Sequence, residues 1–217
     1  MVSRSSINQP ESRLLRTYNR SESVVFYKTK EEFGGLSNMA SGYPLQINGI
    51  SILTTEALYQ VCRFPHIPEI QREIIEQHSP MTAKMKSKPH RKDSRPDWDE
   101  VRHKVMRWCL RVKLVQNHEE FGRLLLATRD RPIVEQSRKD DYWGAKLADV
   151  AGETLIGQNV LGRLLMELRE GLKVVGDGSV KEVPPLNIPN FLLLGAPIET
   201  VTAKSVGNGK KPQRAFF

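Results

Sequence analysis

The sequence has few cysteines and no long apolar run, and each absence excludes a class of protein. Only two of the 217 residues are cysteines, Cys62 and Cys109, and both lie in apolar segments with helical patterning. This usage excludes a disulfide-stapled secreted scaffold. No apolar run approaches the roughly 20 residues that a transmembrane helix needs. The polar residues 1–13 also lack the apolar core of a signal peptide. We therefore expect a cytoplasmic protein with no membrane partner.

Metal-ligand spacings and internal repeats are lacking as well. The five histidines do not combine with one another or with the two cysteines in the spacing of a metal site. We therefore expect neither a metal nor a cofactor. Any chemistry would then be carried by the side chains of the chain itself.

The length and apolar content are those of one packed domain with loose ends. Hydrophobic residues make up 39% of the chain, which is enough for one core and too little for two large ones. Residues 1–22 are polar and aperiodic, and residues 201–217 end in a stretch rich in Gly, Lys and Pro. We expect a single monomeric domain at 23–200, a flexible segment at 1–22 and a flexible basic tail at 201–217.

The hydrophobic patterning predicts an α+β domain that is mainly helical, with a small N-terminal β-hairpin or sheet. Residues 24–27 favour a strand, and residues 43–53 alternate apolar and polar around Asn48–Gly49, which is a strong hairpin signal. Capping residues and apolar periodicity predict six helices, which begin near Thr54, Pro68, Pro80, Asp97, His118 and Asn159.

Positive charge is in excess and is concentrated in one segment. The chain has 33 Lys and Arg against 25 Asp and Glu, a formal charge of +8, and residues 84–113 alone hold eleven basic and four acidic residues. Such a segment is either a solvated face or a surface for a polyanion such as nucleic acid. The predicted nucleic-acid surface consists of Lys86, Lys88, Arg91 and Lys92, continued along the polar side of the next helix by Arg102, Lys104, Arg107, Arg111 and Lys113.

Six short motifs occur in the order that is typical of one family. They are Phe26–Tyr27, Gly35–Met39, Thr54–Gln60 with Arg63–Phe64, Ile133–Glu135 with Ser137, Asp140–Gly144, and Asn159–Gly162 with Leu165, Met166 and Arg169. Together they span roughly residues 24–172, over which the sequence resembles the NADAR, or YbiA-like, family. The resemblance implies a mixed helical and β domain that cleaves N-glycosidic bonds. Some members act on phosphorylated intermediates of riboflavin synthesis. Others remove ADP-ribose from guanine bases, in some cases as antitoxins to DNA-modifying transferases.

Three positions depart from the family pattern. Ile52 stands where the family usually has tryptophan, Ala57 where it has histidine, and Arg63 where it has lysine. Glu56 and Gln60 are retained, so the acid is kept while its surroundings change. The resemblance therefore points to a fold and a reaction class and leaves the substrate open.

Glu56 and Asp140 are the predicted catalytic carboxylates. Cleavage between a ribose anomeric carbon and a base nitrogen passes through a cationic state, which one carboxylate stabilises while a second acid or base manages the proton. Glu56 lies in the first turn of its predicted helix, where the dipole favours the ionised form; an ordinary capping acid is the alternative. Asp140 stands three residues before Trp143, as in the family motif, whereas Asp141 is expected to face solvent.

Lys84 is the third catalytic candidate. A ring-opened ribose exposes an aldehyde, with which a lysine of depressed pKa forms a Schiff base. The alternative is a solvated lysine in a basic run.

The predicted substrate site adds eight residues. Four of them belong to the two motifs that also contain Glu56 and Asp140. Trp143 would stack on adenine or guanine, aimed by a tight turn at Gly144; a core tryptophan is the alternative. Gln60, one helical turn after the acid, would bind a ribose hydroxyl or a base edge. Arg63 is included because it lies in the same motif.

The other four predicted binding residues surround phosphate or orient the site. Ser37 and Asn38 would place small polar groups around a phosphate or ribose, although a Gly-Gly turn is often only a turn. Asn159 would begin a helix whose N-terminus holds a diphosphate, or would simply be its N-cap. Glu135 would orient an active-site side chain.

Three functions fit these observations. The first is an ADP-ribosyl glycohydrolase that acts on ADP-ribosylated guanine in DNA or RNA, with a DNA-ADP-ribosylating toxin as the partner that the resemblance implies. It uses both the carboxylates and the basic surface. The second is an N-glycosidase for a phosphorylated riboflavin-pathway intermediate, which needs no extended basic surface. The third is a non-catalytic module that binds ADP-ribose or nucleic acid.

Overall fold

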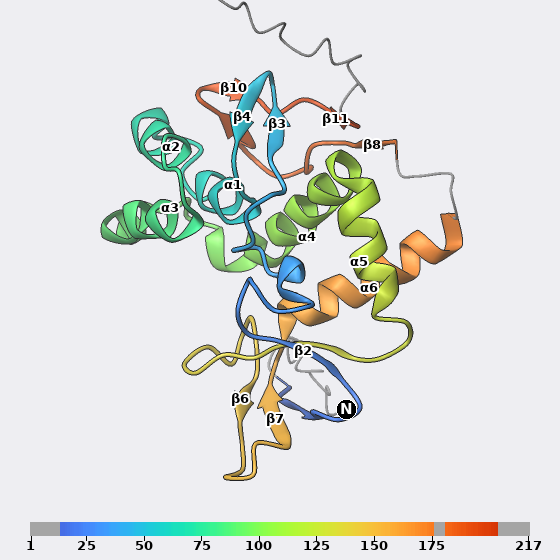
Figure 1. Cartoon of the computed structure of the whole chain (residues 1–217). Coiled ribbons are helices and arrows are strands. Elements are labelled where there is room, and N and C mark those ends of the chain that lie inside the picture. The colour runs from blue at the N-terminus through green and yellow to red at the C-terminus, as the bar shows by residue number, and fades with distance from the viewer. Residues whose placement is uncertain (1–13, 176–180, 204–217) are drawn as a thin grey trace, which may run out of the picture.

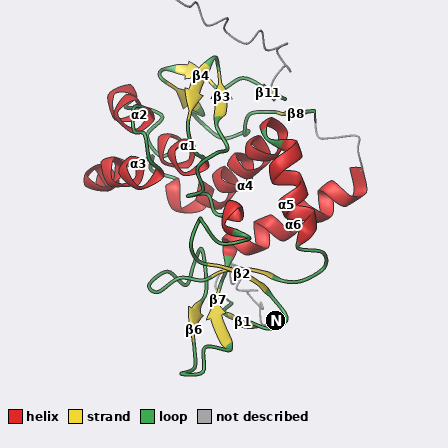
Figure 2. Ribbon diagram, viewed as in Figure 1, coloured by secondary structure: helices red, strands yellow, loops and turns green. Residues whose placement is uncertain are grey.

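The computed structural model describes residues 14–175 and 181–203, which combine six α-helices with five small sheets. The helices are α1 (Thr55–Val61), α2 (Pro68–Ile75), α3 (Pro80–Ser87), α4 (Trp98–Gln116), α5 (Arg123–Ala127) and α6 (Val160–Val175). Helices α1 to α5 gather in the upper part of Figure 1, and α6 runs between them and the strands of the lower end. The predicted α+β class with mainly helical content is confirmed (Figure 2).

Five helices begin within one residue of the predicted start, whereas α5 begins at Arg123, after a π-helical turn at His118–Gly122 where its start was predicted. Thr54 accepts a hydrogen bond from the N–H of Ala57 at 3.2 Å, and Ser79 accepts one from the N–H of Thr82 at 3.1 Å. Such bonds satisfy N–H groups that have no partner within the helix. Capping therefore fixes the starts of α1 and α3, the two helices that carry Glu56 and Lys84.

The strands are short, and half of their pairings join strands that are not consecutive in the chain. They are β1 (Arg16–Asn19), β2 (Val24–Phe26), β3 (Leu45–Ile47), β4 (Ile50–Ile52), β5 (Ile133–Glu135), β6 (Lys146–Leu147), β7 (Thr154–Gly157), β8 (Glu182–Val183), β9 (Leu192–Leu193), β10 (Ala196–Pro197) and β11 (Val201–Thr202). β3 and β4 form the predicted hairpin, with Asn48 and Gly49 at φ of 50° and 76° in its turn. β2 pairs with β5 in parallel, which joins the N-terminal part of the chain to the segment before Glu135.

Two strands lie in segments that the sequence analysis expected to be flexible. β1 lies within residues 1–22 and pairs with β7, and β11 lies within residues 201–217 and pairs with β8. Each is held by a partner far away in the sequence, so its own residues give little local signal. The remaining residues of these two predicted flexible segments, 1–13 and 204–217, lie outside the described residues.

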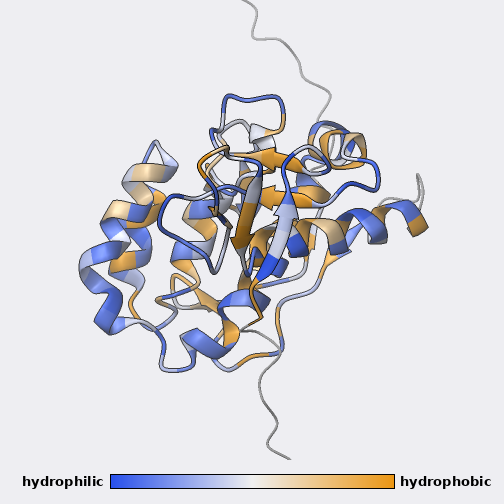
Figure 3. Ribbon diagram, turned by 90° about the horizontal axis from the view of Figure 1, so that it is seen from below, coloured by the Kyte–Doolittle hydropathy of each residue, from blue (hydrophilic) through white to orange (hydrophobic). Residues whose placement is uncertain are grey.

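The core is built around α4. Val105, Trp108 and Val112 lie on its predicted apolar stripe and are buried. The apolar positions of the helices alternate with hydrophilic stretches that face outward, as the colouring of Figure 3 shows. Among the residues described, none of the helices has the length and apolar character needed to span a bilayer.

Lys113, which the sequence analysis placed on the basic surface, is completely buried instead. Its Nζ donates to the carbonyl oxygens of Gly35 and Ser37 at 2.6 and 3.2 Å. The same amine lies 4.2 Å from the ring centroids of Tyr43 and Phe121. Burial lowers the pKa of Lys113 well below that of a solvated lysine. The residue therefore anchors the loop that precedes Asn38 and contributes nothing to the surface.

Candidate active site

Glu56 is a buried acid held by two side-chain amides. The residue is 2% exposed. Its carboxylate accepts hydrogen bonds from Nδ2 of Asn38 and, at 2.8 Å, from Nε2 of Gln60. The hydroxyl of Ser87 donates in turn to Oε1 of Gln60 at 2.8 Å. These bonds link α1, α3 and the loop after the turn Gly34–Leu36, and they fix the direction of the carboxylate.

The surroundings of Glu56 act on its pKa in opposite directions. Burial raises the pKa most, because the charged form loses its hydration. The charges of Lys84 and Arg63 and the hydrogen bonds from Gln60 and Asn38 lower it. The site thus keeps an acid out of water while offering it donors that stabilise the ionised form.

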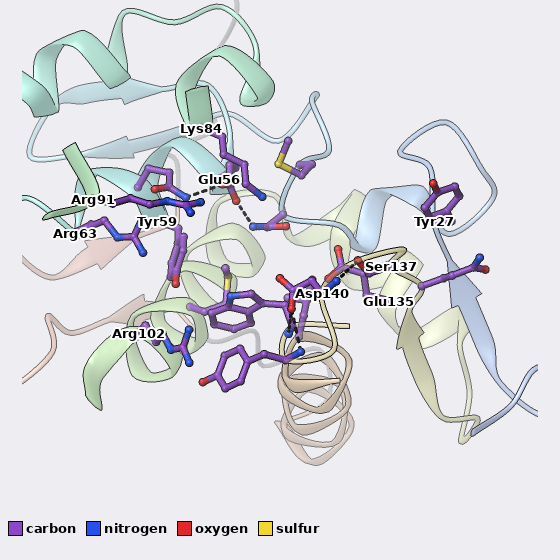
Figure 4. Close-up of a pocket in the computed structure, with 18 residues that line it drawn as sticks. Tyr27, Glu56, Tyr59, Arg63, Lys84, Arg91, Arg102, Glu135, Ser137 and Asp140 are labelled. Carbon is purple, nitrogen blue, oxygen red and sulfur yellow. Dashed lines mark hydrogen bonds between the residues drawn. The ribbon is translucent and has the colours of Figure 1, made fainter. Parts of the chain in front are cut away.

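A cavity of about 380 Å³ lies over Glu56, where side chains of α1, α3 and α4 meet those of the segments that follow β2 and β5. Its walls include eight of the eleven predicted catalytic and binding residues: Glu56, Lys84, Asp140, Asn38, Gln60, Arg63, Glu135 and Trp143. In Figure 4 Glu56 and Lys84 lie close together, Arg63, Arg91 and Arg102 come from one side, and Asp140 and Glu135 from the other. Segments far apart in the sequence therefore meet at one site.

Asp140 lines the cavity but holds a turn with one carboxylate oxygen. Its Oδ1 accepts hydrogen bonds from the N–H groups of Tyr142 and Trp143, both at 2.9 Å. Its own N–H donates to the hydroxyl of Ser137 at 3.0 Å. The aspartate is exposed, so its charge is less costly than that of Glu56. Asp141 points away, as expected, and pairs with Lys146 at 2.5 Å.

Trp143 stands in an aromatic wall. Its ring meets Tyr59 edge-on at a centroid distance of 5.6 Å and Tyr142 edge-on at 5.0 Å. The guanidinium of Arg102 lies 3.8 Å from the ring centroid of Tyr142 and fixes that ring from behind. The half-buried Trp143 thus packs on its neighbours and also faces the cavity. Tyr59, although inside the motif Thr54–Gln60, was not predicted as a site residue, and Arg102 was predicted only on the basic surface; the fold brings both to the cavity.

Asn159 does not offer a diphosphate site, which corrects the prediction. Its Oδ1 accepts from the N–H of Glu135 at 3.1 Å, and its Nδ2 donates to the carbonyl of Ile133 at 2.8 Å. The first N–H groups of α6 are also occupied, because those of Val160 and Leu161 donate to carbonyls of the turn at residues 142 and 143. Asn159 is completely buried and outside the cavity wall, so its amide serves to hold β5.

Ser37 and Gly144 also lie outside the cavity wall and act on the backbone. The hydroxyl of Ser37 accepts from the N–H of Met39 at 3.1 Å. A Cβ at Gly144 would lie 2.4 Å from the carbonyl oxygen of Glu135, so only glycine permits this close approach. The two residues shape the loops that carry Asn38 and Trp143 and do not themselves reach a ligand.

Glu135 is the acid whose importance the sequence did not reveal. It ends β5, lines the cavity and carries a pKa raised to about 7, first by burial and then by the charges of Asp140 and Glu56. Its position in a short apolar strand suggested a residue that orients others. The backbone of Glu135 is held by Asn159 and Gly144, which follow later in the chain.

The basic surface is smaller than its sequence predicts. Lys88 and Lys92 are exposed on the turn Lys88–Asp93, where Arg91 also reaches the cavity wall. Lys86 lies 3.7 Å from Glu73. Beyond this turn, ion pairs join Arg102 to Asp99 and Arg107 to Glu167. Of the predicted basic surface, Lys104 and Arg111 remain exposed on α4, while Lys88, Arg91 and Lys92 are exposed on the turn beside the cavity.

Metal ligands do not gather at the cavity or elsewhere in residues 14–175 and 181–203. No group of three or more His, Cys, Asp and Glu side chains there is placed to hold an ion.

Comparison with known proteins places this site in a family. The model of the NADAR domain matches residues 25–173, more than half of the chain. The protein belongs to the NADAR family. The N-glycosidase YbiA of Escherichia coli, a NADAR relative, is 39% identical over 152 residues, which are 70% of this chain and 89% of that protein.

Two further comparisons concern the fold and a longer relative. The NMR structure of E. coli YbiA aligns with a TM-score of 0.57 at 33% identity and covers 72% of this chain and 91% of that one. The riboflavin biosynthesis protein VVA0006 of Vibrio vulnificus is 31% identical over 171 residues, which are 78% of this chain and 41% of that protein. These relatives support cleavage of an N-glycosidic bond as the reaction class of the NADAR site.

Proposed function

We propose that this NADAR protein is an N-glycosidase that hydrolyses the bond between ADP-ribose and guanine in nucleic acid. The observation that carries the proposal is the shared cavity: buried Glu56, the aromatic wall at Trp143 and Arg91 of the turn Lys88–Asp93 all line one space. The names of the YbiA relatives support the reaction class.

Glu56 is suited to stabilise the cationic sugar that forms as the bond breaks. Its carboxylate is held by Asn38 and Gln60, so little rearrangement is needed when positive charge develops at the anomeric carbon. The low polarity of a buried site strengthens this attraction. Trp143 would receive a purine ring on its exposed face, in which case the sugar lies between the ring and Glu56.

Lys84 lines the same cavity close to Glu56. Its charge lowers the pKa of both Glu56 and Glu135. After the C1′–N bond is hydrolysed, the released ribose opens to an aldehyde at C1′, and this aldehyde would form a Schiff base with the amine, with loss of one water that is regained when the sugar leaves. Lys84 is therefore the proposed covalent partner of the sugar.

The turn Lys88–Asp93 supports nucleic acid as the carrier of the modified guanine. Lys88 and Lys92 are exposed there, and Arg91 reaches from the same turn into the cavity wall. A phosphate backbone that follows this turn would bring an adjoining nucleotide to the mouth. The modified base would be single-stranded or turned out of a duplex, because a stacked base cannot enter a cavity. A DNA-modifying toxin is the proposed source of the substrate.

A phosphorylated riboflavin-pathway intermediate is the second candidate. The name of the Vibrio relative favours it. Three cavity arginines, Arg63, Arg91 and Arg102, offer a phosphate site without any contact to nucleic acid. This substrate would need only the inner cavity.

One experiment separates the candidates. The protein is incubated with an oligonucleotide that carries ADP-ribosyl-guanine and, separately, with the phosphorylated ribosylamino-pyrimidine, and release of the sugar is followed. We expect release from the oligonucleotide and loss of release in Glu56→Gln, whose thermal unfolding is measured as a control. Release from the pyrimidine alone would select the second candidate. Binding of ADP-ribose without release from either substrate would indicate a non-catalytic module.

A further inference from the structure

The carboxyl group of Glu135 differs from the other acids of the cavity in having no hydrogen-bond donor among the described residues. Glu56 accepts from Asn38 and Gln60, and Asp140 accepts from two backbone N–H groups. The hydrogen bonds of Glu135 are made by its backbone alone. Figure 4 shows Glu135 beside Asp140 on the side of the cavity that faces Glu56.

The backbone of Glu135 is nevertheless fixed from three directions. Its N–H donates to Asn159 at 3.1 Å, and its carbonyl accepts from the N–H of Ala145 at 2.8 Å. Gly144 packs directly against the same carbonyl. Phe26 and Glu135 pair in the parallel β2–β5 ladder. A side chain that lacks donors but has a rigid base is suited to exchange a proton with a ligand.

We propose that Glu135 is the acid that protonates the leaving nitrogen and then the base that activates water. This inference rests on the N-glycosidase function proposed above. The C1′–N bond breaks with its electron pair on nitrogen, which takes the proton from Glu135. Water then attacks C1′ and gives one proton to the Glu135 carboxylate, so the group returns to its starting state. Glu56 in its ionised form, which Lys84, Arg63 and its two amide donors favour against the effect of burial, faces the cationic carbon.

The charges around Glu135 support its protonated form at neutral pH. Burial is the largest influence, and the negative charges of Asp140 and Glu56 add to it, so that the pKa rises to about 7 while Lys84 opposes the change. The other charged or titratable side chains on the cavity wall are Tyr27, Tyr59, Arg63, Arg91, Arg102 and Tyr142. A general acid works best when its pKa is near the working pH.

The test uses whichever of the two substrates the wild-type protein cleaves. Glu135→Gln keeps the shape and removes the proton exchange, and Glu135→Asp keeps the acid but shortens its reach. We expect kcat to fall by about 10²–10⁴-fold in Glu135→Gln, the range for loss of a general acid, with little change in KM. We expect an intermediate kcat in Glu135→Asp. Asp141→Asn, which alters an acid outside the cavity, should leave kcat unchanged.

The pH profile distinguishes proton transfer from a structural role. Wild-type kcat/KM should decline as the pH rises above about 7, because the acid loses its proton. This decline should be absent from the residual activity of Glu135→Gln. An active wild type with equal kcat in Glu135→Gln would overturn the inference and leave the proposed function standing. No cleavage by the wild type would overturn the proposed function itself. If Glu135→Gln does not fold, full activity in Glu135→Asp across the pH range would also overturn the inference.

Discussion

The side chain of Asn159 holds the backbone of Glu135 from across 24 residues of sequence, by a hydrogen bond of 3.1 Å. It does so from a left-handed conformation, with φ of 49°, at the residue before α6. The acid at the end of β5 is therefore aligned by the start of a helix.

Replacement of Asn159 is expected both to destabilise the fold and to lower kcat. Asn159→Ala would leave the buried carbonyl of Ile133 and the N–H of Glu135 unsatisfied, at about 1–3 kcal/mol each. Asn159→Gly loses the same bonds but accepts the positive φ, so it should unfold at a higher temperature than Asn159→Ala. Thermal unfolding and kcat measure the two effects. Equal unfolding temperatures for Ala and Gly would show that the left-handed backbone adds no strain.

Glu135→Gln is expected to stabilise the protein at alkaline pH. The pKa of Glu135 is raised from 4.5 to about 7 in the folded state, so the folded protein binds more protons than the unfolded chain between these values. The free energy of unfolding must then fall as the pH rises through this window, by on the order of 3 kcal/mol at about 1.4 kcal/mol per pKa unit. Denaturant unfolding at pH 5 and pH 8 should show this decrease in the wild type. An equal decrease in Glu135→Gln would contradict it.

Substitution of Trp143 is expected to weaken substrate binding, and the effect should be larger when less of the aromatic ring remains. Stacking of a base on an aromatic side chain contributes about 1–3 kcal/mol, so Trp143→Ala should raise KM by roughly 5- to 150-fold. Trp143→Phe should give an intermediate KM, since a smaller ring is kept. Steady-state kinetics on the cleaved substrate provide the measurement. An unchanged KM in Trp143→Ala would assign this ring to packing against Tyr59 and Tyr142 alone.

The lysines of the turn Lys88–Asp93 are expected to make the affinity for oligonucleotide depend on salt concentration. Lys88→Ser with Lys92→Ser should weaken binding of single-stranded oligonucleotide and reduce the slope of log affinity against log salt by about 1.4, or roughly 0.7 per lost phosphate contact. Lys30→Ser with Arg123→Ser removes the same charge elsewhere on the exposed surface and serves as control. Equal slopes in the two double variants would show that only net charge matters. Arg91 is left unchanged because it also lines the cavity.

Local patterns in the sequence predicted the elements that depend on local interactions. The caps at Thr54 and Ser79 and the hairpin turn at Asn48–Gly49 are set by neighbouring residues, and all three are in the structure. β1 and β11 were missed because they consist of four and two residues and are held by distant partners. Length and composition alone cannot reveal such pairing.

The sequence predicted which residues form the site better than it predicted what each of them does. The motif resemblance gathered Glu56, Glu135 and Asp140, which line one cavity. It could not show that Oδ1 of Asp140 caps a turn, although an aspartate two and three residues before the bonded N–H groups is a frequent turn arrangement. The burial of Lys113 was hidden for a different reason: its acceptors, the carbonyls of Gly35 and Ser37, precede it by more than 70 residues.

Helix α3 contributes two residues to the site. It carries Lys84 on the cavity wall, and one turn later its Ser87 hydroxyl steers Gln60, which in turn holds Glu56. A shift of these eight residues would therefore move the amine and the hydroxyl that supports Gln60 together. The position of Lys84 and the support of the carboxylate thus depend on one helix.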